Sequence, residues 1–296
     1  MARRRFGRFA AVGAVLFAGC LALTLWIAVR AHDADASRSV SSVLIEPRQA
    51  LAKAGPARPG RPMTAVATPL GACEARIERM PRALPTVAIV GASYTAGTGP
   101  DNPEQSWAVV LARQLHWNAV VYGVPGTGYL RVSASGRGPM TRMLGALGLR
   151  ALDPALVIIQ AGHDDLGATP ALEERRVRAT VDLVHAAVPG ARIGLLTTFA
   201  FSPEGSPALR ELDQAIIRAG TAADRGVVIM DPLAGRWSFP RAADGLHPTA
   251  AGDAWIAGTV AAILRAHGVR PAPAAAGAPV ICDVSVGAGK PASATA

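Results

Sequence analysis

The sequence Val87-Ala-Ile-Val-Gly91-Ala-Ser93-Tyr-Thr-Ala-Gly97 runs from a short apolar segment into a turn of small residues around one serine. An apolar run of this length, bounded by glycine, is typical of a buried strand. The glycines and alanines beside Ser93 let the backbone bend tightly. We therefore expect Ser93 to lie on a strand-to-helix turn with its hydroxyl accessible. A serine alone is a weak nucleophile at neutral pH and needs a base within hydrogen-bond reach.

Apolar runs and amphipathic segments alternate on both sides of this turn, at intervals of about 30 to 40 residues. In the segment 171–188, leucine and valine share a face opposite Glu173, Glu174 and Arg175, which is typical of an amphipathic helix. Strand and helix in regular alternation predict right-handed crossovers and a parallel sheet of about five strands, covered by helices on both faces. The expected strands are Val87–Val90, Ala119–Tyr122, Ala155–Gln160, Ile193–Thr197 and Val227–Met230, and the expected helices are 104–117, 171–188, 207–222 and 249–267.

Two of the six histidines follow predicted strands on the same edge of the sheet as Ser93, namely His163 and His247. Ligands bind beyond the carboxyl ends of the strands in such sheets. His247 belongs to Asp244-Gly-Leu-His247, in which three residues of turn let the Asp244 carboxylate fold back onto one ring nitrogen. The other nitrogen then faces Ser93. Ser93, His247 and Asp244 are therefore the candidate nucleophile, base and orienting acid.

These motifs resemble those of the SGNH, or GDSL-type, serine hydrolases. Ser93 matches the nucleophile of the family's first block, and Asp244 with His247 matches its closing Asp-x-x-His motif. Gly126 in Val121-Tyr-Gly-Val-Pro-Gly126 corresponds to the glycine of the second block, and Gly162-His-Asp-Asp165 to the third block, normally Gly-x-Asn-Asp. The resemblance covers roughly residues 83–268. It implies an α/β fold, a flavodoxin-like three-layer α/β/α sandwich, and ester cleavage through an acyl-enzyme.

The resemblance also implies an oxyanion hole made of the backbone N–H groups of Ser93 and Gly126 and a side-chain amide from the third block. Here Asp164 stands where the amide is usual, and a carboxylate donates a hydrogen bond only when it is protonated. Loss of one oxyanion donor costs about 10²- to 10³-fold in rate. Three outcomes are open: a neutral Asp164 that donates its proton, an Asp164 that points away while backbone groups suffice, or a protein that binds without turnover.

The N-terminus carries a membrane signal. Four arginines between Arg3 and Arg8 precede the uncharged run Phe9–Val29, whose 21 residues span roughly 30 Å as a helix. The arginines favour a cytoplasmic N-terminus with the rest of the chain exported. We therefore expect residues 1–30 to be an uncleaved, single-pass transmembrane signal anchor. Cleavage after Ala36, which gives a secreted protein, and lipidation of Cys20 are the alternatives.

The Pro-, Ala- and Arg-rich composition of residues 31–82 predicts a linker. Residues 271–296 are expected to form an Ala/Pro/Gly-rich tail, interrupted by Ile281-Cys282-Asp-Val. This leaves 83–270 as the hydrolase domain. Cys73 and Cys282 bracket it, and in an exported chain such a pair favours a disulfide, with two free thiols as the alternative.

The formal net charge of +9 is unevenly distributed. Residues 1–82 contain 13 basic and 5 acidic side chains, whereas residues 83–270 contain 16 and 15. A nucleic-acid-binding domain needs its positive charge on the folded face, so we expect no nucleic-acid partner. The sequence contains no phosphate-binding glycine loop, Cys-x-x-Cys pair or His-x-x-x-His helix, so we predict no cofactor and no metal.

Together these features predict a membrane-anchored, extracytoplasmic serine hydrolase that cleaves carboxylic esters of small molecules, glycans or lipids. Two alternatives remain open. One is a catalytically impaired module of the same fold that binds envelope glycan or lipid, for which Asp164 is the argument. The other is an O-acyltransferase that uses the same triad. For Tyr94, Tyr129 and Trp237 we favour a role in core packing over one in lining a substrate groove. The sequence leaves the substrate-binding residues and the oligomeric state open.

Overall fold

The computed structural model describes residues 71–81, 84–100, 102–201, 205–272 and 277–282. The predicted signal anchor, with Cys20 and the cleavage site at Ala36, lies outside the described residues. In the ranges just given, no helix combines the length and the apolar character needed to cross a membrane.

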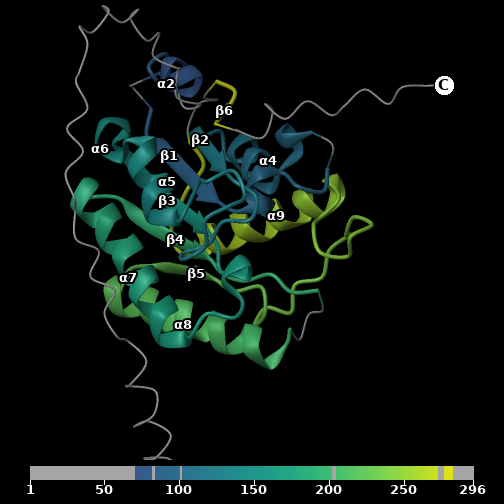
Figure 1. Ribbon diagram of the computed structural model, residues 1–296. Helices are drawn as coiled ribbons and strands as arrows, with labels where there is room; N and C mark the ends of the chain where they lie inside the picture. Colours follow the sequence, from purple (N-terminus) through teal and green to yellow (C-terminus); the bar gives the residue numbers. More distant parts are fainter. Residues whose placement is uncertain (1–70, 82–83, 101, 202–204, 273–276, 283–296) are drawn as a thin grey trace, which may run out of the picture. The chain divides into compact units, whose positions relative to one another are not determined.

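A parallel sheet of six strands forms the middle layer, in the order β5-β4-β3-β1-β2-β6 (Figure 1). All neighbouring strands pair in parallel. The first five have the flavodoxin-like order, in which ligands bind where the order reverses beside β1. The five predicted strands are confirmed, and the sequence does not predict the sixth. The strands are β1 Thr86–Gly91, β2 Asn118–Gly123, β3 Pro154–Gln160, β4 Arg192–Leu196, β5 Val228–Met230 and β6 Val280–Ile281.

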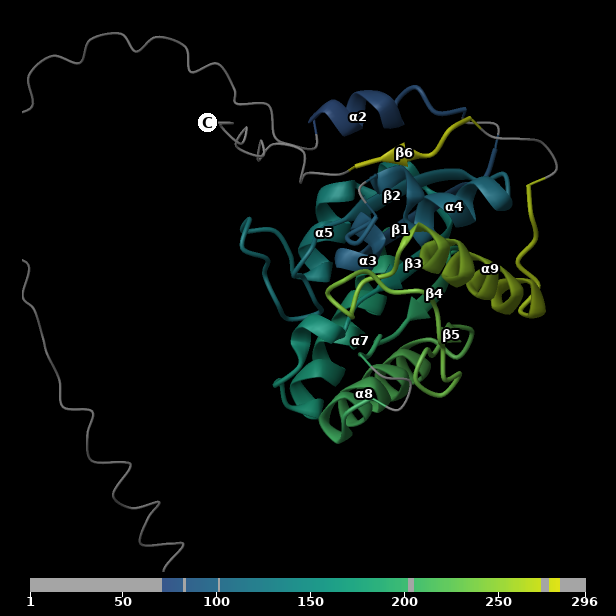
Figure 2. The ribbon, with the colours of Figure 1, turned by 90° about the vertical axis from the view of Figure 1, so that its right-hand side faces the viewer.

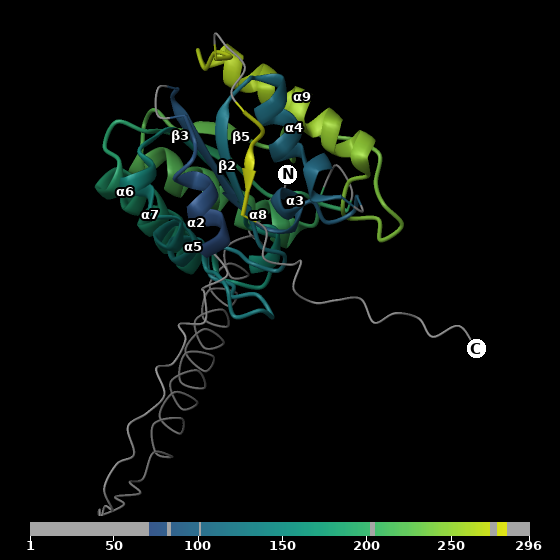
Figure 3. The same cartoon turned by 90° about the horizontal axis from the view of Figure 1, so that it is seen from above.

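Helices cover both faces of the sheet, so the predicted three-layer sandwich is confirmed (Figures 2 and 3). Alternate residues of a strand face opposite sides: in β1, Ala88 and Val90 belong to the core under α5, α7 and α8, whereas Val87 and Ile89 belong to the core under α4 and α9. The helices are α2 Gly71–Ile77, α3 Ser93–Ala96, η1 Pro103–Gln105, α4 Trp107–Gln114, α5 Met140–Leu147, α6 Leu149–Leu152, η2 His163–Asp165, α7 Pro170–Ala187, α8 Pro207–Ala223 and α9 Ala250–Ala266.

Hydroxyl side chains fix the starts of three long helices. Ser106 accepts a hydrogen bond from the Val109 N–H at α4, and Ser206 does the same for Leu209 at α8. Thr249 accepts from Gly252 at the start of α9. Such caps satisfy N–H groups that have no partner within the helix. The cap at Thr249 lies two residues after His247, so it fixes the point at which the histidine loop enters α9.

One helical face differs from the prediction. α7 buries Val177, Val181 and Val184 as expected, but Glu173, predicted on the polar face, is also fully buried. The prediction was wrong because the helical period places a residue relative to its own helix only. The first turn of α7 meets the side chain of Asp165 on η2, and this contact encloses Glu173.

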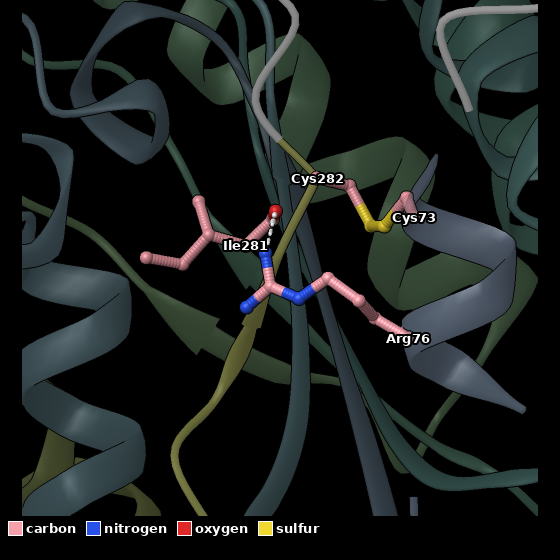
Figure 4. The surroundings of a disulfide bond; sticks show 4 residues. All are labelled: Cys73, Arg76, Ile281 and Cys282. Atoms are coloured by element: carbon pink, nitrogen blue, oxygen red, sulfur yellow. Dashed lines mark hydrogen bonds between the residues drawn. A yellow bond between two sulfur atoms is a disulfide. The ribbon is translucent and has the colours of Figure 1, made fainter. Parts of the chain in front are cut away.

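The predicted disulfide between Cys73 and Cys282 is confirmed, with the two Cα atoms 5.4 Å apart (Figure 4). It links α2, inside the predicted linker, to the end of β6, inside the predicted tail. The Arg76 side chain also donates a hydrogen bond to the Ile281 carbonyl, and the Cys282 N–H donates to Val121 on β2. The bond closes a loop of 209 residues, and loop-closure entropy for that length stabilises the fold by about 5 kcal/mol.

Candidate active site

Ser93 is the first residue of α3 and follows β1, the strand flanked by β2 and β3. Its side chain is partly exposed, whereas the three residues after it are buried. The N–H of the first helical residue has no acceptor within the helix, so it remains free to bind an anion. The structure therefore places Ser93 as the sequence predicts, on a strand-to-helix turn at the carboxyl edge of the sheet.

Ser93, His247 and Asp244 form a continuous hydrogen-bonded series. His247 Nε2 lies 2.9 Å from Ser93 Oγ, and His247 Nδ1 lies 2.6 Å from Asp244 Oδ2. An ionised carboxylate only accepts hydrogen bonds, so Nδ1 carries the proton and Nε2 is left as the acceptor for the serine hydroxyl. The structure thus brings together the three residues that the sequence selects and orients the imidazole as a base.

The Asp244 carboxylate is held in its charged form. The hydrogen bond from His247 and the backbone N–H of Leu246 lower the pKa of Asp244 to about 2. Its other oxygen, Oδ1, accepts the N–H groups of Leu246 and His247, both at 2.9 Å. Asp244 therefore fixes both the imidazole ring and the backbone of the turn that carries it.

A second set of contacts holds the histidine loop. The Leu246 carbonyl accepts hydrogen bonds from the Tyr94 hydroxyl at 2.7 Å and from Arg241 at 2.9 Å. The Tyr94 ring stacks on Phe199 with the centroids 4.0 Å apart, and burial raises the pKa of Tyr94, so the hydroxyl remains a donor. Tyr94 is therefore a buried positioning residue. No sequence pattern points to Arg241.

Gly126 lies in the loop that follows β2. The N–H of Val124, at the start of the loop, donates to the Gly91 carbonyl next to the serine turn. Gly126 has φ +76°, in the left-handed region that favours glycine.

Asp165 Oδ2 accepts the N–H of Tyr129 at 2.6 Å, and its Oδ1 accepts those of Leu130 and Arg131 at 3.1 and 2.9 Å. Asp165 thus fixes the far side of the Gly126 loop.

Asp164 lies on η2, immediately after β3, with its side chain partly buried. Burial raises the pKa of Asp164, and the charges of His163, Arg131 and His247 oppose that rise. The carboxyl group therefore lies within electrostatic reach of His247. Compared with an exposed aspartate, Asp164 is shifted toward the protonated form that can donate a hydrogen bond.

The remaining predicted residues are placed as follows. Tyr129 and Trp237 are buried, as expected of packing residues. His163 bonds through Nδ1 to the Phe199 carbonyl at 2.8 Å, away from the serine series. Large apolar side chains are exposed on the loops after β2, β3 and β4, at Val132, Leu166 and Phe201. Within the described ranges, no group of His, Cys, Asp and Glu could hold a metal ion.

A cavity of about 710 Å³ lies at the opposite edge of the sheet. It is lined by Glu74 and Glu78 of the α2 region, by Leu147 of α5 and by the amino ends of β1 and β2. None of the candidate site residues lines it, so it has no part in the chemistry at Ser93.

A doubly wound parallel sheet that holds serine, histidine and aspartate in hydrogen-bonded series at its carboxyl edge defines a class, the serine hydrolases built on an α/β/α sandwich. The sequence model of the GDSL-like lipase/acylhydrolase family matches residues 89–255. The chain belongs to this family, and the resemblance seen in its motifs is confirmed.

The chain is 29% identical to a GDSL lipase of Mycobacterium tuberculosis (strain ATCC 25618 / H37Rv) over 199 residues, which cover 60% of this chain and 80% of the relative. Two solved structures share the fold. A carbohydrate esterase family 2 enzyme from Corynascus thermopiles (Myceliophthora fergusii) has a TM-score of 0.52 at 22% identity over 64% of this chain and 68% of its own. A carbohydrate acetylesterase from Sinorhizobium meliloti has a TM-score of 0.51 at 19% identity over 62% and 99%.

Proposed function

We propose that this protein is an esterase that cleaves carboxylic esters with Ser93 as nucleophile, His247 as general base and acid, and Asp244 as the group that orients the histidine. The observation that carries the proposal is the unbroken series from Ser93 Oγ through both ring nitrogens of His247 to Asp244. Each partner lies within the reach that proton transfer requires.

The reaction proceeds in two halves. Ser93 Oγ bonds to the ester carbonyl carbon while its proton passes to His247 Nε2. The ester C–O bond then breaks, His247 returns the proton to the leaving alcohol, and the acyl group stays on Ser93. Water repeats the sequence: His247 takes a water proton, the hydroxide bonds to the acyl carbon, and Ser93 leaves with the proton. The products are an alcohol and a carboxylic acid, and Ser93 and His247 are regenerated.

The negative charge that develops on the carbonyl oxygen is stabilised by the N–H groups of Ser93 and Gly126 and by Asp164 in its protonated form. Burial favours that form. When Asp164 ionises, one donor is lost and a negative charge faces the oxyanion. Oxyanion stabilisation therefore weakens as the pH rises through the pKa of Asp164.

The substrate in this proposal is an ester with an apolar acyl group. Val132, Leu166 and Phe201 expose apolar surface on three loops at the same edge of the sheet as Ser93. The ring of His163, in the third block, packs edge-on against the Phe201 ring with the two centroids 5.9 Å apart. Each methylene removed from water contributes about 0.8 kcal/mol to binding. The alcohol is a small molecule, a glycan or a lipid headgroup.

The proposed location is the outer side of the cell membrane, with residues 1–30 as a single-pass anchor. The disulfide between Cys73 and Cys282 supports an exported domain, because such bonds persist in oxidising compartments. Protease treatment of intact spheroplasts tests this location: an exported domain is degraded, and a domain that survives until lysis contradicts it. Appearance of the domain in the culture medium would favour cleavage after Ala36.

Hydrolysis of p-nitrophenyl acetate, butyrate and octanoate tests the activity. Ser93→Ala and His247→Ala are each expected to lower kcat by 10⁴-fold or more, whereas His185→Ala, a histidine on the outer face of α7, serves as the matched control. Equal rates in wild type and Ser93→Ala would contradict the proposal and favour a binding module. Transfer of the acyl group to an added sugar in preference to water would favour an O-acyltransferase.

A further inference from the structure

A buried pair of acidic side chains lies behind the Gly126 loop and takes no part in the proposed proton transfers. Asp165 is 4% exposed and Glu173 is 0% exposed. Asp165 accepts three backbone N–H groups, those of Tyr129, Leu130 and Arg131. Burial raises the pKa of Asp165, and the three backbone N–H groups oppose that rise by stabilising the charged carboxylate.

Glu173 has no such donors. In the part of the chain that the structure describes, neither of its carboxyl oxygens accepts a hydrogen bond from an N–H or O–H group. The group that acts on it is the Asp165 carboxyl, which raises the pKa of Glu173 both through its charge and as a hydrogen-bonding partner. Two carboxyl groups can share a hydrogen bond only when one carries a proton. Because three backbone N–H groups stabilise charge on Asp165 and no such donor reaches Glu173, we assign the proton to Glu173.

We propose that Asp165 and Glu173 act as one positioning pair for the oxyanion loop, in which neutral Glu173 donates its proton to the Asp165 carboxylate that holds residues 129–131. This inference rests on the proposed esterase function, because the loop is the one that carries Gly126. The remaining loop contacts agree with it. The Thr127 hydroxyl donates to the Val124 carbonyl at 2.9 Å, and Gly128 N–H donates to Arg131 at 3.1 Å.

Gly128 shows how closely the loop and the pair approach each other. A Cβ atom added to Gly128 would overlap the carboxylate of Asp165. The loop therefore passes directly over Asp165, and any displacement of that carboxylate moves the backbone that continues from Gly126. A second negative charge beside Asp165 would cause such a displacement, because like charges repel strongly in a buried site.

The charges around the pair make it sensitive to alkaline pH. Burial, followed by the charge of Asp165, raises the pKa of Glu173 to about 9. Asp164 on η2 acts on Asp165, and Tyr129 on the loop interacts with both members of the pair and with Asp213 on α8. Each of these groups adds negative charge when it ionises. Above about pH 9 Glu173 ionises against Asp165, and the loop is expected to loosen.

The test compares kcat and KM from pH 7 to 10.5 in wild type, Glu173→Gln and Asp253→Asn, with Ser93→Ala as the blank for spontaneous hydrolysis. Asp253 is a matched control, because it is equally buried but binds the N–H of Trp107 on the other face of the sheet. The wild type is expected to lose kcat by about 10²-fold above pH 9, the cost of one oxyanion donor, with little change in KM. The amide of Glu173→Gln donates at every pH, and any loss due to Asp164 is common to both proteins, so the ratio of variant to wild-type kcat should rise from about 1 at pH 7 to about 10² above pH 9. Asp253→Asn should follow the wild type.

A second readout does not depend on activity. Pulsed hydrogen exchange, corrected for the intrinsic pH dependence, should show lower protection of residues 129–131 above pH 9 in the wild type and unchanged protection in Glu173→Gln. If Glu173→Gln loses kcat and hydrogen-exchange protection above pH 9 to the same extent as the wild type, the pairing is overturned. If hydrolysis is absent but protection follows the expected pattern, the pairing stands and the proposed esterase function fails.

Discussion

Asp164→Asn replaces a carboxylate that donates only when protonated by an amide that donates at every pH. The substitution keeps the shape of the side chain and leaves Ser93 and His247 in place. Because Asp164 lies in the third block, where the family usually has asparagine, the variant supplies at every pH the donor that Asp164 supplies only when it is protonated. We expect it to raise the rate of ester hydrolysis.

The size of the effect depends on the protonation of Asp164. Burial raises its pKa, so the fraction of wild-type side chain that is neutral and can donate grows as the pH falls, and the ratio of variant to wild-type kcat should fall toward one. At alkaline pH the wild type lacks one donor, which is worth about 10²- to 10³-fold. A negative charge 4 Å from the oxyanion adds up to about 4 kcal/mol of repulsion at an effective dielectric near 20. The ratio should therefore increase with rising pH, toward at least about 10².

The assay is kcat for p-nitrophenyl acetate between pH 5.5 and 9, with Ser93→Ala as the blank. Asp182→Asn, which changes an exposed aspartate on α7, is the control for loss of one negative charge. Thermal unfolding confirms that each variant is folded. A folded Asp164→Asn with an equal or lower kcat at every pH would refute the reasoning, and a raised but pH-independent ratio would show that Asp164 acts without titrating.

Three further predictions concern stability and specificity. The pKa of Glu173 is raised from 4.5 to about 9 in the folded protein, so the folded state holds an extra proton between these pH values and its stability falls as the pH rises, by up to about 1.4 kcal/mol per pH unit. The Tm of Glu173→Gln should therefore exceed the wild-type Tm by a margin that grows from pH 5 to 8, and a constant margin would contradict this. Phe201→Ser removes apolar surface at the rim of the site, so kcat/KM for the octanoate ester should fall about tenfold, as expected for about 1.5 kcal/mol of lost burial. The kcat/KM for the acetate ester should change little, and equal losses on both esters would argue against a contact between Phe201 and the acyl chain. Cys282→Ser opens the 209-residue loop and should lower the free energy of unfolding in urea by up to about 5 kcal/mol, whereas an unchanged urea midpoint would show that the disulfide adds no stability.

The sequence predicts the parts of this site that depend on local order along the chain. Ser93 and the Asp244-to-His247 turn are found because parallel strands bring their carboxyl ends to one edge of the sheet, so motifs that follow strands meet there. The alternation of strands and helices predicts the parallel sheet, and the flavodoxin-like order is implied by the family resemblance. The second and third blocks are located in the same way, by their position after the second and third strands.

The parts that the sequence misses depend on contacts between distant segments. Glu173 fits the polar face of α7 by periodicity, yet the loop and η2 enclose it. Asp165 could have capped its own turn, and only the path of residues 129–131 shows that it binds the neighbouring loop. β6 contains two residues in a tail of low complexity, and it forms because β2 offers an open edge and Cys282 is tied to Cys73.

Reaction with a fluorophosphonate probe, followed by intact-mass and peptide analysis, tests the central claim most directly, because the probe bonds only to a serine that an adjacent base has activated. The wild-type protein is expected to gain one adduct, located on Ser93, that is absent in Ser93→Ala and forms at least 10³-fold more slowly in His247→Ala. Folded wild-type protein that gains no adduct, or an adduct that persists in Ser93→Ala, would contradict the assignment of Ser93 as the nucleophile.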